Sequence, residues 1–296
     1  MITPKFPYLC RKNKAMTECL GKYFMRNGKL LETNGFQCDF LSRPHYIYEV
    51  FRVIEGIPLF IEDHLERLRQ TVRLSGLQED SVPGDFFEQV SRLVEANELR
   101  EGNIKVVVLP GEGDEPADFM IYVMEHQYPT KEQFIEGVAL ALHQGIRQNP
   151  NAKVMDVGLR SNANAIKHEQ QVYETLLVDE QDCITEGSRS NVFFVYGQGL
   201  ITPPIEDVLP GVTRKHVVKL CRDLGIPLSE QKVPESSLAE MEGVFITGTS
   251  RKVLPAFRID AWLYPPDHPI IRRVQQAFNR QVKRYLDGAV AKNPLG

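Results

Sequence analysis

The first strong alternation of apolar and polar residues covers residues 46–62, where β-branched and aromatic side chains are interrupted by Glu55 and Gly56. This pattern is typical of a β-hairpin that turns at these two residues. In residues 63–77, leucine and valine recur near helical spacing, which predicts a helix directly after the hairpin. Asp63 stands at the start of that segment and is the predicted N-cap.

Similar patterns continue along the chain. A second helix is predicted over residues 85–99, and strands over 103–109 and 118–124. The later predicted elements are strands at 137–146, 172–179 and 183–204, a helix at 210–226, a short helix and a strand within 233–260, and an amphipathic helix at 270–286. One face of the closing helix is apolar and predicts a buried contact. The residues on that face are Ile271, Val274, Phe278 and Val282.

Strands and helices are mixed in both halves of the chain, and its length suggests two domains of ordinary size. We therefore predict an α+β fold with two lobes. The predicted division is a small N-terminal α/β lobe at residues 1–125, a linker at 126–134 and a larger C-terminal lobe at 135–296.

Composition narrows the classes of function. The chain has 296 residues, 42% of them hydrophobic and 25% charged, which is typical of a globular protein. A formal net charge of -4 gives no basic excess for nucleic acid, so small molecules are the expected ligands. The five cysteines are scattered without a Cys-x-x-Cys pair, and we expect no metal site. No apolar run predicts a signal peptide or a membrane span, so the expected location is the cytoplasm.

Five short segments carry residues suited to chemistry: HLERL at 64–68, AKV at 152–154, CITEGSRSNVFF at 183–194, LPGVTR at 209–214 and ITGTS at 246–250. Each has an ordinary explanation when taken alone. HLER is typical of a solvated helix face, a strand that ends in TEG is common, and PGVTR is an ordinary helix start. The chemistry therefore has to be inferred from the combination.

In that combination, the chain resembles the fold-type IV, or class IV, family of pyridoxal-phosphate enzymes. The family holds branched-chain aminotransferases, D-amino acid aminotransferases and aminodeoxychorismate lyase. The resemblance covers about residues 46–260 and preserves the order and spacing of the segments. It implies a two-lobed fold with pyridoxal 5'-phosphate in the cleft between the lobes. It also implies a homodimer that takes amino acids and 2-oxo acids as substrates.

The cofactor phosphate is a dianion, which favours the free N–H groups and the dipole at a helix N-terminus. Residues 209–214 supply a helix start, and residues 246–250 supply a second group of donors. Turn chemistry alone would also explain the glycines of both segments. The resemblance implies a cation from HLERL. The predicted phosphate ligands are Arg67, Val212, Thr213, Gly248, Thr249 and Ser250.

The pyridine ring needs a carboxylate against its nitrogen, because a protonated nitrogen draws electrons from the substrate. Glu186 lies between two strand-like runs, where an acidic residue is otherwise usually a solvated turn residue. The resemblance implies that Glu186 contacts the ring nitrogen and that Leu209 lies on the ring face.

The reactive lysine is inferred from spacing. Lys153 lies 33 residues before Glu186 and follows the strand at 137–146 at the family's distance. The resemblance implies that it binds the cofactor covalently and then moves a proton as a neutral amine. The residues after it depart from the family pattern. Lys167 is a competitor, and Arg160 aligns with the lysine if a gap is allowed, which would describe a catalytically dead relative.

The substrate-binding residues are the least specified by the sequence. Tyr48 stands where the family places an aromatic residue, and Arg52 shares its strand face. The Arg-x-His pair of the D-amino acid enzymes and the arginine of the branched-chain enzymes are both missing near Val108. Arg189 and Arg251 lie beside predicted cofactor ligands. We predict that one of them binds a substrate carboxylate, although a salt bridge is an equal alternative for each.

The leading predicted function is amino-group transfer between an amino acid and a 2-oxo acid, as in the branched-chain aminotransferases. Aminodeoxychorismate lyase, which eliminates pyruvate with the same cofactor, is one alternative. A pyridoxal-phosphate-binding relative without catalysis is the other.

Overall fold

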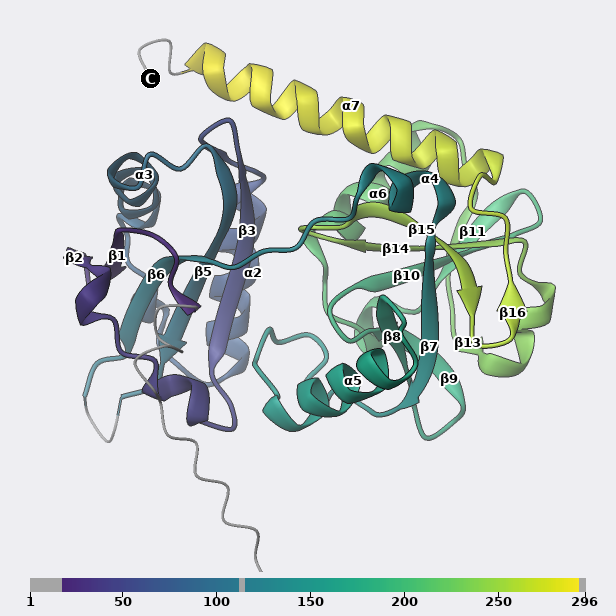
Figure 1. The fold of residues 1–296 in the computed structure, drawn as a ribbon, viewed down its shortest axis with the longest axis horizontal. Helices are drawn as coiled ribbons and strands as arrows, with labels where there is room; N and C mark the ends of the chain where they lie inside the picture. The colour runs from purple at the N-terminus through teal and green to yellow at the C-terminus, as the bar shows by residue number, and fades with distance from the viewer. Residues whose placement is uncertain (1–17, 112–114, 293–296) are drawn as a thin grey trace, which may run out of the picture.

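Two β-sheets form the frame of the computed structural model, which describes residues 18–111 and 115–292. They lie in two lobes (Figure 1). The first sheet consists of β1 (Tyr23–Arg26), β2 (Lys29–Glu32), β3 (Ile47–Ile54), β4 (Ile57–Pro58), β5 (Glu101–Leu109) and β6 (Asp118–Met124). Its strand order is β2-β1-β6-β5-β3-β4. The predicted hairpin at 46–62 and the strand pair β5 and β6 are confirmed.

The second sheet is larger. Its strands are β7 (Val138–Gln144), β8 (Glu174–Val178), β9 (Cys183–Gly187), β10 (Asn191–Tyr196), β11 (Gly199–Thr202), β12 (Leu228–Glu230), β13 (Val233–Pro234), β14 (Gly243–Gly248), β15 (Lys252–Ile259) and β16 (Trp262–Leu263). The order is β12-β11-β10-β14-β15-β7-β8-β9-β13, and β16 pairs with β15. The expected α+β architecture in two lobes is confirmed. The linker predicted at 126–134 stays a prediction, and α4 (Lys131–Glu136) begins within it.

Two helices cover one face of the first sheet. They are α2 (Ile61–Leu74) and α3 (Phe86–Ala96), and their apolar sides form one buried cluster with β3 and β5. The prediction that Asp63 caps α2 is wrong, because the helix begins at Ile61 after Phe60, whose φ is 52°. Strand β4 runs almost directly into the helix, so the start falls earlier. The carboxylate of Asp63 instead accepts from His216 at 2.8 Å and from Lys215 at 2.7 Å.

The closing helix connects the two lobes. Helix α7 (Pro269–Lys292) lies across the second lobe, next to α6 (Val212–Asp223), and extends toward the first (Figure 1). Its predicted apolar face is confirmed, since all four predicted residues are buried. They share a hydrophobic cluster with Leu59 and Phe60 of the first lobe. Among the described residues, no helix combines the length and the apolar character that a membrane span requires.

The segment that carries Lys153 crosses from the second sheet to the first. The backbone N–H of Tyr48 donates to the Lys153 carbonyl at 3.1 Å, and that of Met155 donates to the Tyr46 carbonyl at 2.8 Å. Helix α5 (Val157–Glu169) then begins at Asp156, whose carboxylate accepts from the Leu159 N–H at 2.9 Å. The segment therefore pairs with β3 and places Lys153 between the lobes.

Candidate active site

A cavity of about 690 Å³ lies between the two lobes. Its walls contain every predicted site residue except Arg52. The cavity walls come from elements far apart in the chain: β3 and α2 of the first lobe, and α5, α6 and the ends of β9 and β14 of the second. Because titratable side chains converge in it, this cavity is the candidate active site.

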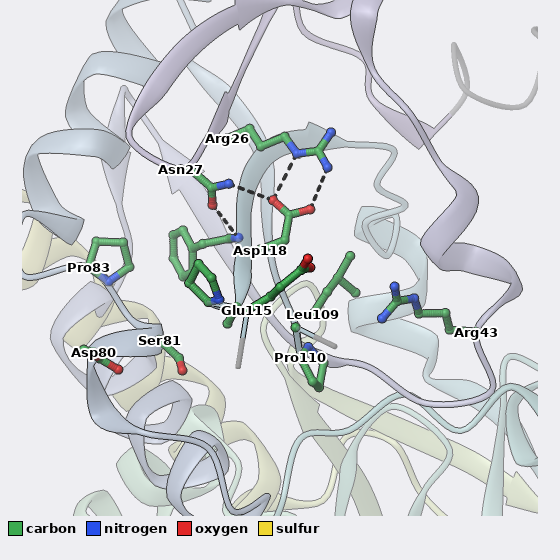
Figure 2. A pocket seen from close by; sticks show the side chains of 14 residues that line it. Arg26, Asn27, Arg43, Asp80, Ser81, Pro83, Leu109, Pro110, Glu115 and Asp118 are labelled. Carbon is green, nitrogen blue, oxygen red and sulfur yellow. Dashed lines mark hydrogen bonds and ion pairs between the residues drawn. The ribbon is translucent and has the colours of Figure 1, made fainter. Parts of the chain in front are cut away.

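A second cavity, of about 610 Å³, lies beside the β5–β6 turn and is shown in Figure 2. Two of its charged groups form an ion pair with each other, since Arg26 donates to both oxygens of Asp118 at 3.0 and 2.8 Å. Asn27 donates to the same carboxylate. Among the described residues its walls carry no lysine. It therefore lacks the amine that covalent attachment of an aldehyde cofactor requires.

The start of α6 forms one end of the active-site cavity. Gly211 is the N-cap, and no side chain caps the helix among the described residues, so the first N–H groups remain available. Val212 and Thr213 follow in the first turn. A Cβ at Gly211 would overlap the side-chain oxygen of Asn191, whose Nδ2 donates to the Leu209 carbonyl at 2.9 Å. Only glycine therefore fits this position without moving Asn191.

Two buried hydroxyls in the cavity walls fit a phosphate ligand. Ser190 Oγ and Thr247 Oγ1 are buried and have no hydrogen-bond partner among the described residues. An unpaired buried hydroxyl is costly, so a bound acceptor would stabilise both. The hydroxyls of Thr249 and Ser250 instead connect the lobes, bonding the Val50 carbonyl at 3.3 Å and Asn103 at 2.9 Å. The hydroxyls of Ser190 and Thr247 and the N–H groups at the start of α6 together form a donor set that fits a dianionic phosphate.

Arg67 lies beside the start of α6 and is held from the first lobe. It donates to the Pro210 carbonyl at 3.2 Å and to both oxygens of Glu49 at 2.9 and 2.6 Å. His64 shares that carboxylate at 3.1 Å. Burial raises the pKa of Glu49, but the charges and hydrogen bonds of Arg67 and His64 together outweigh this and hold the pKa well below the ordinary value. The segment HLERL indicates Arg67 as a cation, but nothing in the sequence indicates that Glu49 and His64 position it.

The amine of Lys153 lies inside the cavity, 4.8 Å from the centre of the Tyr48 ring. Burial lowers its pKa, and the charges of Arg67 and Arg147 lower it further, against the opposing effects of Tyr48 and Glu49. The backbone N–H of Lys153 donates to the Thr71 hydroxyl at 3.1 Å, which fixes the segment. The site thus favours the neutral amine that proton transfer requires.

Glu186 is 2% exposed and bonded through both oxygens. One accepts from Arg147 Nε at 2.7 Å, and the other accepts from the Leu209 N–H at 3.1 Å. A carboxylate has further lone pairs, so these bonds leave room for a ring N–H. Sequence reasoning missed Arg147, which is separated from Glu186 by 39 positions and carries no local signal.

Tyr48 is bonded to Arg160, whose Nη2 donates to its hydroxyl at 3.0 Å. Burial would raise the pKa of Tyr48, but the charges of Lys153, Arg160 and Arg147 outweigh it and lower the pKa to about 7. From the sequence, Arg160 stands out only because it aligns with the family's lysine when a gap is allowed. The structure places Arg160 and Lys153 in the same cavity, where Arg160 bonds the Tyr48 hydroxyl and the Lys153 amine lies over the Tyr48 ring.

The predicted carboxylate-binding arginines differ in their surroundings. Arg251 forms an ion pair with the fully buried Glu174 at 3.0 Å and donates to the Arg189 carbonyl at 3.2 Å. Arg189 donates to Asn164 of α5 at 3.1 Å. Its guanidinium therefore has a neutral partner, whereas that of Arg251 has an anionic one.

Arg52 lies outside the cavity walls, which corrects its predicted role. Its guanidinium stacks on the ring of Tyr128 at 3.8 Å and pairs with Glu101 at 3.4 Å. The strand period placed it on the same face as Tyr48, as expected, but Tyr128 covers that part of the strand.

Comparison with known proteins agrees with this geometry. The class IV aminotransferase family model matches residues 46–259. D-alanine aminotransferase from Bacillus licheniformis is 25% identical over 272 residues, which cover 86% of this chain and 95% of that protein. Branched-chain-amino-acid aminotransferase from Salmonella typhimurium is 26% identical over 291 residues, which cover 89% and 94%.

The fold is similar to that of solved aminotransferases. The branched-chain amino acid aminotransferase from Escherichia coli has a TM-score of 0.76 at 22% identity, over 87% of this chain and 93% of that structure. Another branched-chain amino acid aminotransferase, with a TM-score of 0.77, was solved with pyridoxamine 5'-phosphate. The expected fold-type IV architecture is confirmed. Since the family model matches well over half of the sequence, the chain belongs to the class IV aminotransferases.

Proposed function

We propose that this chain uses pyridoxal 5'-phosphate, attached to Lys153, to move an amino group between an amino acid and a 2-oxo acid. The observation that supports the proposal best is the position of the Lys153 amine. It is buried in a cavity that also contains a carboxylate held by two donors, Glu186, and the uncapped start of α6. When bound, the cofactor supplies an electron-withdrawing ring that stabilises negative charge at the substrate α-carbon.

The second lobe binds most of the cofactor in this proposal. The N–H groups of Val212 and Thr213 and the hydroxyls of Ser190 and Thr247 hold the phosphate. Gly248 at the end of β14 borders the same cavity, as do Thr249 and Ser250 in the loop that follows, and Arg67 adds a cation from the first lobe.

At the ring, Glu186 keeps the pyridine nitrogen protonated, because a nearby negative charge favours the charged ring. Arg147 and the Leu209 N–H hold the carboxylate in place. Leu209 lines the same cavity, and its side chain would supply an apolar contact to the ring when the cofactor is bound.

Lys153 moves the proton at the substrate α-carbon. Its lowered pKa favours the neutral amine, which accepts that proton as a general base and returns it as an acid. Tyr48, which lies under the amine, borders the substrate.

Arg189 binds the substrate α-carboxylate in preference to Arg251. Arg251 is already neutralised by Glu174, and separating this pair would leave a fully buried carboxylate unpaired. Arg189→Met should therefore raise KM, while an unchanged KM would remove Arg189 from the substrate site.

A labelling experiment tests the proposal. Purified protein with added cofactor should be yellow, and borohydride should attach the cofactor to the peptide that contains Lys153. Lys153→Ala should remain unlabelled. Label on a peptide with Lys167 would overturn the assignment of the lysine, and absence of both colour and label would overturn the cofactor site.

The reaction type is tested by adding single amino acids without acceptor. Conversion of the cofactor to its pyridoxamine form supports amino-group transfer. Release of pyruvate from aminodeoxychorismate, without that conversion, would instead identify a lyase.

A homodimer in the cytoplasm completes the proposal, supported by the family resemblance. Sedimentation velocity tests the dimer, and a monomer at working concentration would refute it. Cell fractionation tests the location.

A further inference from the structure

One wall of the active-site cavity carries three cations that the proposed cofactor chemistry does not use. Arg160 and Lys167 come from α5, and Arg189 comes from the turn after β9. We call them the α5 cation cluster. Within the part of the chain that the structure describes, none of the three forms an ion pair with a carboxylate.

The other arginines and lysines of the cavity wall, except Lys153, each form an ion pair with a carboxylate. Each has a carboxylate within 3.0 Å, so its charge is balanced inside the protein. The pairs are Arg67 with Glu49, Lys105 with Glu18, Arg147 with Glu186, and Arg251 with Glu174. The unbalanced positive charge is therefore confined to the α5 cation cluster and the reactive lysine.

Two members of the cluster lie along one face of α5, and the third lies beside that face. Arg160, Asn164 and Lys167 are four and three residues apart in α5, which places them on the same side. Arg189 donates to Asn164 at 3.1 Å and so lies along this face. Arg160 reaches the hydroxyl of Tyr48 at 3.0 Å, next to the Lys153 amine. The cluster thus begins at the reacting centre and extends away from it.

The charges in the cluster repel one another. Burial lowers the pKa of Arg189 to about 10, with a further contribution from Arg160, although the residue as a whole is exposed. Burial also lowers the pKa of Lys167, and Arg189 and Arg160 add to the effect against the attraction of Glu174. Glu174 does not neutralise them, because it is bonded to Arg251 and Ser188. An anionic ligand would relieve this repulsion.

We propose that Arg160 and Lys167 bind a second anionic group, at the end of the substrate side chain, so that the enzyme prefers amino acids with acidic side chains. The inference rests on the proposed function. The substrate α-carboxylate balances one charge of the cluster, that of Arg189, and leaves two. An apolar branched side chain would bury these two cations without a partner, which selects against it.

The test measures cofactor conversion by single amino acids in the holoenzyme. The L and D forms of glutamate, aspartate, O-phosphoserine, leucine and alanine are compared by kcat/KM of the half-reaction. An acidic substrate should exceed leucine and alanine at least about tenfold, as expected for one charge-assisted hydrogen bond. Preference for O-phosphoserine over the dicarboxylates would identify the anion as a phosphate, and the reverse would identify it as a carboxylate; both support the cluster.

Three variants separate the cluster from general charge effects. Arg160→Met and Lys167→Met should each lower the acidic-to-neutral ratio of kcat/KM at least about tenfold. Lys167 is included because, unlike Arg160, it is not hydrogen-bonded to Tyr48 in the described part of the chain. Arg73→Met, which removes an exposed guanidinium paired with Glu79 outside the cavity, should leave the ratio unchanged.

Two failures are distinguishable. If leucine or alanine reacts as fast as the acidic substrates, or if both variants keep the ratio, the acidic-substrate inference is overturned while the aminotransferase stands. If no amino acid converts a cofactor that borohydride attaches to Lys153, amino-group transfer is overturned, and the inference with it.

Discussion

At the scale of single residues, most of the site depends on side chains that hold other side chains. Glu49 positions Arg67, Arg147 positions Glu186, and Arg160 contacts Tyr48. These contacts join positions 18, 39 and 112 residues apart in the chain. The sequence could indicate the residues of the phosphate and ring sites through recognisable local segments. It could not indicate their partners, because an arginine that follows a strand has no local feature that reveals its carboxylate.

Glu49→Gln tests the positioning of Arg67. The substitution keeps the shape but removes the charge, and leaves a buried guanidinium without its anion. We expect a loss of about 3–5 kcal/mol in the free energy of unfolding, measured by urea denaturation, together with weaker cofactor binding. The control is Glu66→Gln, whose exposed pair with Lys215 should cost less than about 1 kcal/mol. Equal losses in the two variants would contradict the role of Glu49.

Tyr48 should titrate near neutral pH. The charges of Lys153, Arg160 and Arg147 lower its pKa to about 7, so the negatively charged phenolate is favoured above pH 7 and the phenol below it. Ultraviolet difference absorption between the wild type and Tyr48→Phe should show a step near pH 7. In Arg160→Met one of these cations is lost, and the step should move to higher pH. A step that stays in place would show that Arg160 does not act on Tyr48.

At the scale of elements, local patterns predicted most strands and helices, and the errors have physical causes. The sequence predicts that α2 starts at Asp63 because a carboxylate is a good N-cap, whereas in the structure this carboxylate bonds to α6. Strand periodicity predicts that Arg52 faces the pocket, but periodicity gives only the strand face and not the side chain that covers it, here Tyr128. Spacing from the preceding strand and from Glu186 selects Lys153 as the reactive lysine. In the structure Lys153 lines the cavity between the lobes.

Gly211→Ala tests the start of α6. The added methyl group would overlap the Asn191 side chain, which must move and release the Leu209 carbonyl. We expect cofactor affinity to fall at least about tenfold, in line with the loss of one charge-assisted hydrogen bond, measured by absorbance titration. In Gly35→Ala, where a Cβ meets nothing within 4 Å, the affinity should be unchanged. Wild-type affinity in Gly211→Ala would show that the phosphate lies elsewhere.

At the scale of the whole molecule, the site requires both lobes, and polar contacts join them near the cavity. Asp63 of α2 accepts from His216 and Lys215 of α6, and Phe60 stacks on His216 with ring centres 3.9 Å apart. The hydrogen bond from His216 is the main cause that lowers the pKa of Asp63. No local pattern in the sequence could predict this contact, since the residues lie more than 150 positions apart.

Asp63→Asn should lower stability in a pH-dependent way. A carboxyl group with a depressed pKa in the folded state stabilises the protein above its unfolded pKa, and this contribution is lost as the pH falls through the folded value. The pair is partly exposed, so we expect a loss of about 1 kcal/mol in the free energy of unfolding at pH 7. The difference between variant and wild type should disappear at acidic pH. A difference that is constant with pH would assign the effect to packing instead.

The pairing of residues 152–155 with β3 has a consequence for motion. Lys153 belongs to the second lobe by its place in the chain, but to the first by its hydrogen bonds. If the lobes rotate against each other, the amine travels with Tyr48, whereas Glu186 and α6 travel with the second sheet. Rotation of the lobes would therefore change the distance between the Lys153 amine and Glu186, so the two groups that would act on the cofactor come into range only when the lobes are held together.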